Sequence, residues 1–122
     1  MSDDRIRVLL VDDHTLFRKG LAELLEQRGQ IRVVGMAGNG DAALGLLAET
    51  SPDVVITDLN MPPQGGIALL RRIRTENWRG PVLILTVSDA EDDLAGAMRA
   101  GAQGYLLKDM EPDDVVDLAL GG

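Results

Sequence analysis

Short apolar runs alternate along the chain with segments in which apolar residues recur every three or four positions. Short β-branched runs are typical of buried strands, and the wider spacing is typical of amphipathic helices. The predicted strands are Ile6–Val11, Ile31–Ala37, Val54–Thr57, Val82–Thr86 and Tyr105–Leu107. The predicted helices carry the stripes Phe17, Leu21, Leu24 and Leu25; Ala43, Leu46 and Leu47; Leu69, Leu70 and Ile73; Leu94, Ala97 and Met98; and, after Pro112, Val115, Val116, Leu118 and Ala119.

This alternation predicts an α/β fold with helices on both faces of a parallel sheet, because each parallel connection needs a crossover and a helix usually provides it. We therefore expect a doubly wound, five-stranded sheet. The flavodoxin-like order 2-1-3-4-5 would make the first, third and fourth strands neighbours. No internal repeat or linker divides residues 1–122, so one domain is expected.

Composition narrows the chemistry that this domain can carry. The chain is 45% hydrophobic but only 2% aromatic, with a net charge of −8. Aromatic platforms for base stacking are therefore disfavoured, and the overall field repels nucleic-acid phosphates. Cysteine is absent, and no apolar stretch approaches the ~20 residues of a membrane span. We expect a cytoplasmic domain that binds neither nucleic acid nor membrane directly.

Polar residues follow the predicted strands at the carboxyl edge, where open parallel sheets bind ligands. Asp12 and Asp13 follow the first strand, Asp58 the third, Thr86 ends the fourth and Lys108 follows the fifth. Clustered carboxylates need a cation, and oxygen ligands with room for water suit Mg²⁺. The hydroxyl and the ammonium would then bind phosphoryl oxygens. Taken singly, the first pair also suits a helix N-cap, and the other carboxylate and the lysine suit surface positions.

At these residues the sequence resembles the receiver domains of two-component response regulators. The matching stretches are 8–14, 58–62 with Gly66, Thr86 and Lys108, whereas 35–40 and 104–112 resemble the NarL/FixJ branch. The resemblance implies a CheY-like fold in which Asp58 is the phosphoacceptor. It assigns Mg²⁺ to Asp12, Asp13, Asp58 and the backbone carbonyl of Asn60, phosphoryl contacts to Thr86 and Lys108, and the switch to Thr86 and Tyr105.

The same resemblance implies a signalling switch rather than an enzyme, with at most slow self-dephosphorylation. Its expected partners are a sensor histidine kinase and a C-terminal helix-turn-helix DNA-binding output domain outside residues 1–122. The face made by the helix at Leu94–Met98, the strand at 105–107 and the helix after Pro112 is the expected output surface and a candidate homodimer contact. Small residues there suit a contact or only tighter packing of that helix: Ala95, Gly96, Ala97, Ala100 and Gly101.

Four other functions fit parts of the sequence. Residues 38–43 form a G-x-G-x-x-A dinucleotide fingerprint, but they also suit a turn in which Asn39 or Asp41 caps a helix. A flavin mononucleotide carrier would need anion donors where the first acidic pair stands. A Mg²⁺-dependent phosphohydrolase shares the aspartyl nucleophile but usually has a second acid where Asn60 stands. A phosphorylation-independent binding module is the fourth.

The remaining conspicuous residues have plainer interpretations. His14 is expected at a helix start near the acidic cluster, and Phe17 in the core. The arginines at 71, 72, 74 and 79 are expected on a solvated helix face. Val87 follows Thr86 where the family often has alanine, and we expect it to restrict access to the phosphoryl group. Trp78 has no assignment from sequence.

Overall fold

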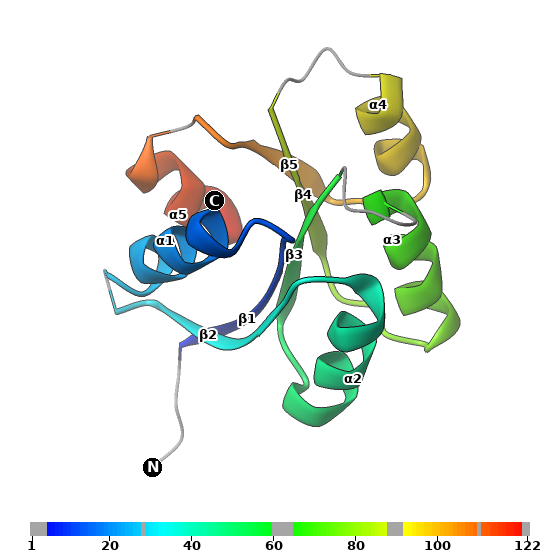
Figure 1. Ribbon diagram of the computed structural model, residues 1–122, viewed down its shortest axis with the longest axis horizontal. Coiled ribbons are helices and arrows are strands. Elements are labelled where there is room, and N and C mark those ends of the chain that lie inside the picture. The colour runs from blue at the N-terminus through cyan, green and yellow to red at the C-terminus, as the bar shows by residue number, and fades with distance from the viewer. Residues whose placement is uncertain (1–4, 28, 60–64, 88–91, 110, 121–122) are drawn as a thin grey trace.

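Strands and helices alternate five times in the computed structural model, which describes residues 5–27, 29–59, 65–87, 92–109 and 111–120 (Figure 1). The strands are β1 (Ile6–Val11), β2 (Ile31–Ala37), β3 (Val54–Asp58), β4 (Val82–Thr86) and β5 (Gly104–Leu107). The helices are α1 (Thr15–Glu26), α2 (Gly40–Thr50), α3 (Gly65–Thr75), α4 (Asp92–Arg99) and α5 (Pro112–Ala119). The predicted strands are confirmed, with β3 ending and β5 beginning one residue beyond the expected limits.

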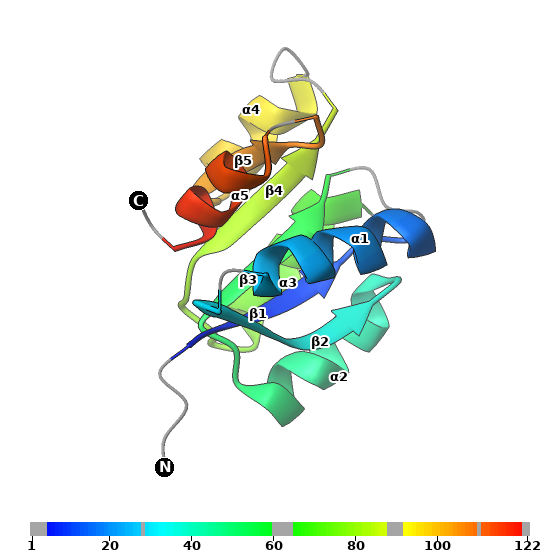
Figure 2. The same ribbon diagram turned by 90° about the vertical axis from the view of Figure 1, so that its left-hand side faces the viewer.

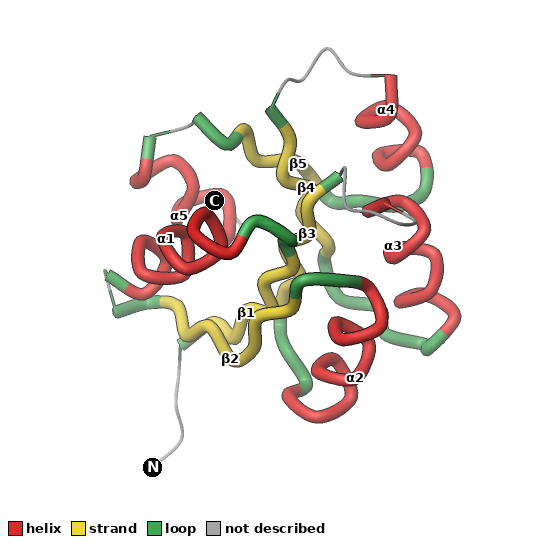
Figure 3. The backbone as a smooth tube through the Cα atoms, viewed as in Figure 1, coloured by secondary structure: helices red, strands yellow, loops and turns green. Residues whose placement is uncertain are grey.

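All strand pairings are parallel, and the order is β2-β1-β3-β4-β5, which confirms the predicted topology. Helices α1 and α5 cover one face of the sheet, and α2, α3 and α4 cover the other (Figures 1 and 3). The register pairs Asp58 with Leu85 and Thr86 with Leu107. The carboxyl ends of β3, β4 and β5 therefore meet at one edge, and β1 joins them through β3.

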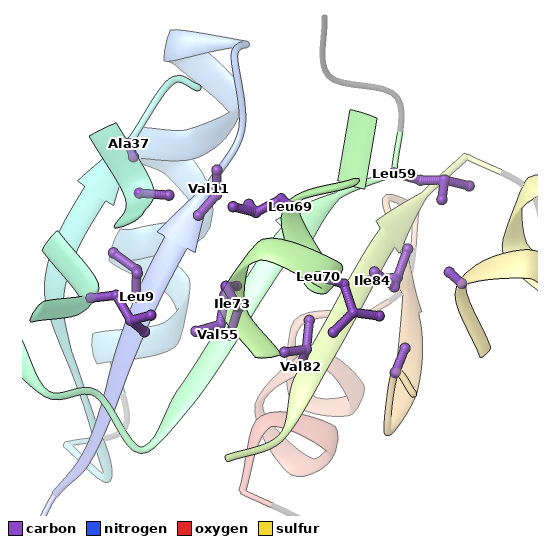
Figure 4. Close-up of a cluster of buried hydrophobic side chains, with 14 of the residues drawn as sticks. Leu9, Val11, Ala37, Val55, Leu59, Leu69, Leu70, Ile73, Val82 and Ile84 are labelled. Carbon is purple, nitrogen blue, oxygen red and sulfur yellow. The ribbon is translucent and has the colours of Figure 1, made fainter. Parts of the chain in front are cut away.

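Two aliphatic cores lie on opposite faces of this sheet because successive strand side chains alternate between faces. Leu9 and Val11 pack under α2, α3 and α4, as Figure 4 shows together with Val55 and Ile84. Val8 and Leu10 pack instead under α1 and α5. Strands covered on both faces need apolar residues at nearly every position, which explains their continuous runs.

Some members of the predicted stripes lie outside the cores. Met98 is 39% exposed and Leu118 is 37% exposed, so their assignment to buried stripes was wrong. Phe17 is partly buried and packs against the core below α1. No described helix is long and apolar enough to cross a membrane.

The arginines around α3 are more engaged than the sequence indicates. Arg72 binds Asp41 on α2 at 2.9 Å. Arg74 donates to the carbonyl oxygens of Trp78 and Gly80 at 2.9 and 2.8 Å, and its guanidinium lies 5.9 Å from the Trp78 ring centroid. These two arginines therefore brace the element ends rather than only coat a solvated face. Trp78 packs partly buried against the core on this side.

Candidate functional site

Five of the predicted site residues, Asp12, Asp13, Asp58, Thr86 and Lys108, lie at or just beyond the carboxyl ends of strands. Figure 2 shows these strands running in the same direction. Asp12 follows β1, and Asp58 and Thr86 end β3 and β4; their exposed fractions are 0%, 4% and 1%. Asp13 is exposed, and the side chain of Lys108 is 16% exposed. Most polar groups at this edge are thus removed from water. Charges interact more strongly in such a poorly solvated place than in water.

Lys108 joins the two buried carboxylates. Its Nζ lies 3.3 Å from Asp12 Oδ2 and 3.4 Å from Asp58 Oδ2. The same ammonium lies 4.8 Å from the centroid of the Phe17 ring on α1. Among the described residues nothing hydrogen-bonds to the buried Asp12 Oδ2, so the charge of the lysine compensates it here. The arrangement compensates two adjacent carboxylates with one cation.

The turn after β1 holds Asp12 by its backbone and its side chain. Its N–H donates to Ala37 O at 3.0 Å, and its carbonyl accepts from Arg18 Nη1 at 2.6 Å. Its Oδ1 accepts the backbone N–H of His14 at 2.9 Å. Helix α1 has His14 as its N-cap, without a side-chain cap bond. The N-cap interpretation of the acidic pair was therefore wrong, and the expected place of His14 is confirmed.

Four side chains at this edge bring metal-ligating atoms together. One ligand atom from each of Asp12, Asp13, His14 and Asp58 lies within 4.8 Å of the others. His14 Nδ1 lies 3.2 Å from Asp12 Oδ1 and 3.4 Å from Asp13 Oδ1. Three carboxylates, one of them with a buried oxygen that has no hydrogen bond among the described residues, fit a hard divalent cation. The predicted carbonyl ligand at Asn60 lies outside the described residues.

Gly66 allows α3 to begin directly against the end of β3. Its N–H donates to Leu59 O at 2.9 Å, and a Cβ at this position would clash with the Asp58 carbonyl oxygen. Only glycine fits this close backbone approach. The position of Asp58 therefore depends on a residue eight positions along the chain.

The predicted switch residues occupy neighbouring strands. Thr86 is buried at the end of β4, and Tyr105 on β5 is 36% exposed. The Lys108 N–H donates to Thr86 O at 2.9 Å, which ties the lysine backbone to the end of β4. Sequence reasoning missed the roles of Phe17 and Arg18. Their positions in the first turn of the helix after the acidic pair are the signal that could have indicated them.

Comparison with known proteins decides the family. Residues 8–119 match the response regulator receiver domain. The chain belongs to this family. As a receiver domain it is a signalling module rather than an ordinary enzyme. Its CheY-like fold carries the acidic cluster at the carboxyl edge of the sheet, as the sequence predicts.

Relatives of this receiver include nitrate/nitrite regulators. It is 44% identical over 93% of the chain to a nitrate/nitrite response regulator protein homolog of Haemophilus influenzae, and 40% identical over 89% to NarL of Escherichia coli. The chain spans 55% and 50% of these two proteins, about half their length. The receiver domain of a putative NarL of Mycobacterium tuberculosis superposes with a TM-score of 0.90 at 35% identity, covering 97% of this chain and 95% of that one.

Proposed function

We propose that this receiver accepts a phosphoryl group on Asp58 from a sensor histidine kinase and thereby switches an attached output domain. The observation that carries the proposal is the Lys108 ammonium, held 3.3 and 3.4 Å from two buried carboxylates at the ligand-binding edge of the sheet. Phosphoryl transfer depends mainly on positioning and on compensation of charge, and this edge offers both.

In the transfer, a carboxylate oxygen of Asp58 forms a bond to phosphorus while the bond from phosphorus to the donor imidazole nitrogen breaks. The product is an acyl phosphate on Asp58 and a free histidine on the kinase. Lys108 already contacts Asp58 and would oppose the new negative charge on the phosphoryl oxygens. The buried hydroxyl of Thr86, at the end of the next strand, would donate to one of them.

Mg²⁺ is the cofactor that we propose for this site. Asp12, Asp13 and Asp58 would hold it, together with the backbone carbonyl of Asn60. When bound, the ion would neutralise part of the charge shared by the carboxylates and the phosphoryl group. The buried Asp12 oxygen, which has no hydrogen bond within the described part of the chain, supports this assignment.

We place the output surface on α4, β5 and α5, with Thr86 and Tyr105 as the switch. Five carboxylates border it, and all are exposed: Asp109, Glu111, Asp113, Asp114 and Asp117. This strip has the charge to meet a basic helix-turn-helix DNA-binding domain or, on the same face, a second receiver. Among the small residues of α4, Ala97 is fully buried and Gly96 faces Ile67 on α3, whereas Ala95 is exposed and can take part in the contact.

The test is labelling with a small-molecule phosphodonor and Mg²⁺, followed by intact mass. We expect one phosphoryl adduct on the wild type and none on Asp58→Asn, because an amide cannot form the acyl phosphate. Asp53→Asn is the matched control. Asp53 directly precedes β3, at the opposite end of the strand from Asp58, and accepts the Arg7 N–H. An adduct that persists in Asp58→Asn would remove this residue from the acceptor role.

The same assay separates the alternatives. A single stoichiometric label with slow release is expected of the receiver, whereas rapid multiple turnover would indicate a phosphohydrolase. Labelling that proceeds equally fast in a chelator would contradict the metal assignment.

Val87, which is 66% exposed beside Thr86, is proposed to slow hydrolysis of the acyl phosphate by restricting the access of water.

A further inference from the structure

Phe17 is the one phenylalanine of the chain, and it stands where an aliphatic residue would satisfy the core. It lies in the first turn of α1 and packs, partly buried, against the core below α1 and α5. The other described members of that core are aliphatic. What an aromatic ring adds at this position is a face of negative potential, which attracts a cation.

The cation that this face meets is the site lysine. Lys108 Nζ lies over the Phe17 ring, 4.8 Å from its centroid, which is within the range of a cation–π interaction. The same ammonium lies 3.3 Å from Asp12 Oδ2 and 3.4 Å from Asp58 Oδ2. The lysine side chain is only 16% exposed, and a cation–π interaction is stronger in a poorly solvated place. The ammonium is therefore held by residues of α1, of the turn after β1 and of β3.

The start of α1 fixes the ring relative to Asp12. Asp12 Oδ1 accepts the His14 N–H at 2.9 Å, and the Asp12 carbonyl oxygen accepts from Arg18 Nη1 at 2.6 Å. Phe17 lies between these two donors in the chain. The ring and the buried carboxylate thus belong to one hydrogen-bonded turn, which places two partners of the lysine together.

A cavity beside the ring gives the lysine side chain an alternative place. It has a volume of about 250 Å³ and lies between α1 and α5, lined by Phe17, Lys108 and apolar residues that include Leu21, Leu24 and Val115. A lysine stem has many rotamers, and fixing it in one of them costs conformational entropy. Without the ring this cavity would be larger, and the stem would lose the neighbour that directs it towards the acidic residues.

We propose that Phe17 is a positioning residue for phosphoryl transfer: its ring holds the Lys108 ammonium beside Asp58, so that the charge is in place when the phosphoryl group arrives. This inference rests on the proposed function of Asp58 as the acceptor. A charged group stabilises a transfer most when it needs no rearrangement during the reaction. Loss of the ring should therefore slow the labelling of Asp58 without changing which residue is labelled.

Substitutions at Phe17 separate the effect of the ring from that of its apolar bulk. Phe17→Leu keeps an apolar side chain against the core but removes the aromatic face, whereas Phe17→Tyr keeps the ring. With phosphodonor and Mg²⁺, we expect Phe17→Leu to label Asp58 about three- to tenfold more slowly than the wild type, and Phe17→Tyr to stay within about twofold of it. Leu25→Val is the control and should label as the wild type, because it removes a methylene from the same core about two turns further along α1. Equal rates for the wild type and Phe17→Leu, or equal slowing by Phe17→Leu and Phe17→Tyr, overturn the proposal.

A double-mutant cycle with Lys108→Met tests whether the ring acts through the lysine. Methionine removes the charge, so in that background Phe17→Leu should slow labelling less than about 1.5-fold. Losses that multiply would show that Phe17 acts independently of the lysine, as a merely structural residue does, and would overturn the proposal. If Lys108→Met labels too slowly to follow, thermal midpoints in a chelator give a second cycle. Phe17→Leu should then lower the midpoint less in Lys108→Met than in the wild type, and equal losses contradict the pairing.

The contact between ring and lysine has a spectroscopic signature of its own. The chain has two lysines, and the exposed Lys19 provides the reference. The ring current of Phe17 should move the ε-methylene protons of Lys108 upfield of those of Lys19 in the wild type and in Phe17→Tyr, and Phe17→Leu should remove this shift. Coincident positions in the wild type contradict the geometry. Absence of labelling in the wild type would instead refute the proposed function, and the ring-current shift would still decide whether Phe17 holds Lys108.

Discussion

Lys108 carries the charge balance of the site. Its ammonium contacts two carboxylates whose exposed side-chain fractions are 0% and 5%. Removing one partner of a fully buried ion pair typically costs about 3–5 kcal/mol, because the remaining charge lies uncompensated in a poorly solvated place. The 16% exposure of the lysine side chain reduces that cost here.

Lys108→Met should therefore lower the free energy of unfolding by about 1–3 kcal/mol in the presence of a chelator. Methionine keeps an unbranched stem against Phe17 but removes the charge. Saturating Mg²⁺ should raise the thermal midpoint of the variant more than that of the wild type, because the ion replaces the lost cation. Thermal unfolding followed by circular dichroism measures both effects. Lys19→Met, on the exposed face of α1, is the control, and equal midpoints for the two variants would contradict the argument.

Gly66→Ala should destabilise the domain by about 2 kcal/mol or more, because the new Cβ would collide with the Asp58 carbonyl oxygen. Gly45→Ala is the matched control. It lies within α2 with open space around it, so alanine should be neutral or stabilise by about 0.5–1 kcal/mol. Urea denaturation of both variants gives the comparison. Similar stabilities would show that the close approach of α3 to β3 is not a constraint.

At the scale of elements, α1 and α2 begin differently although both start a few residues after a strand ends. Asn39 caps α2, and its side-chain oxygen accepts the Ala42 N–H at 2.8 Å. His14 begins α1 without a side-chain cap bond, and its own N–H donates to Asp12 Oδ1 at 2.9 Å. The start of α2 is thus stabilised by its own side-chain cap, whereas α1 begins next to the acidic cluster without such a cap.

Asn39→Ala should lower the free energy of unfolding by about 1 kcal/mol, since the cap oxygen is lost. Asn39→Ser keeps an acceptor and should retain most of the stability. Chemical denaturation with the two variants side by side tests this. If both lose the same amount, the hydrogen bond to Ala42 is not what stabilises this end of α2.

Element type and order were predictable because the central strands β1, β3 and β4 are largely buried on both faces and each helix has an apolar stripe. The errors fall where an element touches little of the core. In α4 the buried contact is made by Leu94 and Ala97, so Met98, about 100° further around the helix, reaches solvent. On α5, Leu118 turns away from the core made by Val115 and Val116. The spacing of apolar residues along a helix does not reveal how much of the helix surface contacts the core.

At the scale of the whole molecule, the site is connected to the proposed output surface through β4 and β5. Thr86 ends β4, Lys108 directly follows β5, and a backbone hydrogen bond of 2.9 Å joins them. A phosphoryl group can shift populations only by its different interaction with two conformations. The ends of β4 and β5 are where this difference would first be felt.

Phosphorylation should therefore change backbone amide shifts along residues 82–87 and 104–109 and in α4, and leave α2 and β2 nearly unchanged. Two-dimensional amide spectra before and after addition of phosphodonor and Mg²⁺ provide the measurement. Asp58→Asn, which cannot be phosphorylated at this position, is the control. Changes confined to the surroundings of Asp58 would refute the proposed route to the output surface.

The site was predictable because parallel strands bring their carboxyl ends to one edge, so Asp12, Asp58, Thr86 and Lys108 could be placed together from order alone. The sequence did not reveal which acids are buried, or that Lys108 contacts both Asp12 and Asp58. Those facts depend on side-chain depth and on the packing of α1 against the site. Phe17 is an example, because a core residue by pattern also lies against the site lysine.

Trp78 lies at the opposite end of β4 from the acidic cluster, packed against the core with Arg74 over its ring. It is the single tryptophan of the chain. Its fluorescence should consequently follow global unfolding and ignore events at Asp58. The protein thus carries an intrinsic optical reporter of stability that is separate from its signalling chemistry. A change in Trp78 fluorescence on ligand binding would mean that the structure had changed between the site and this indole.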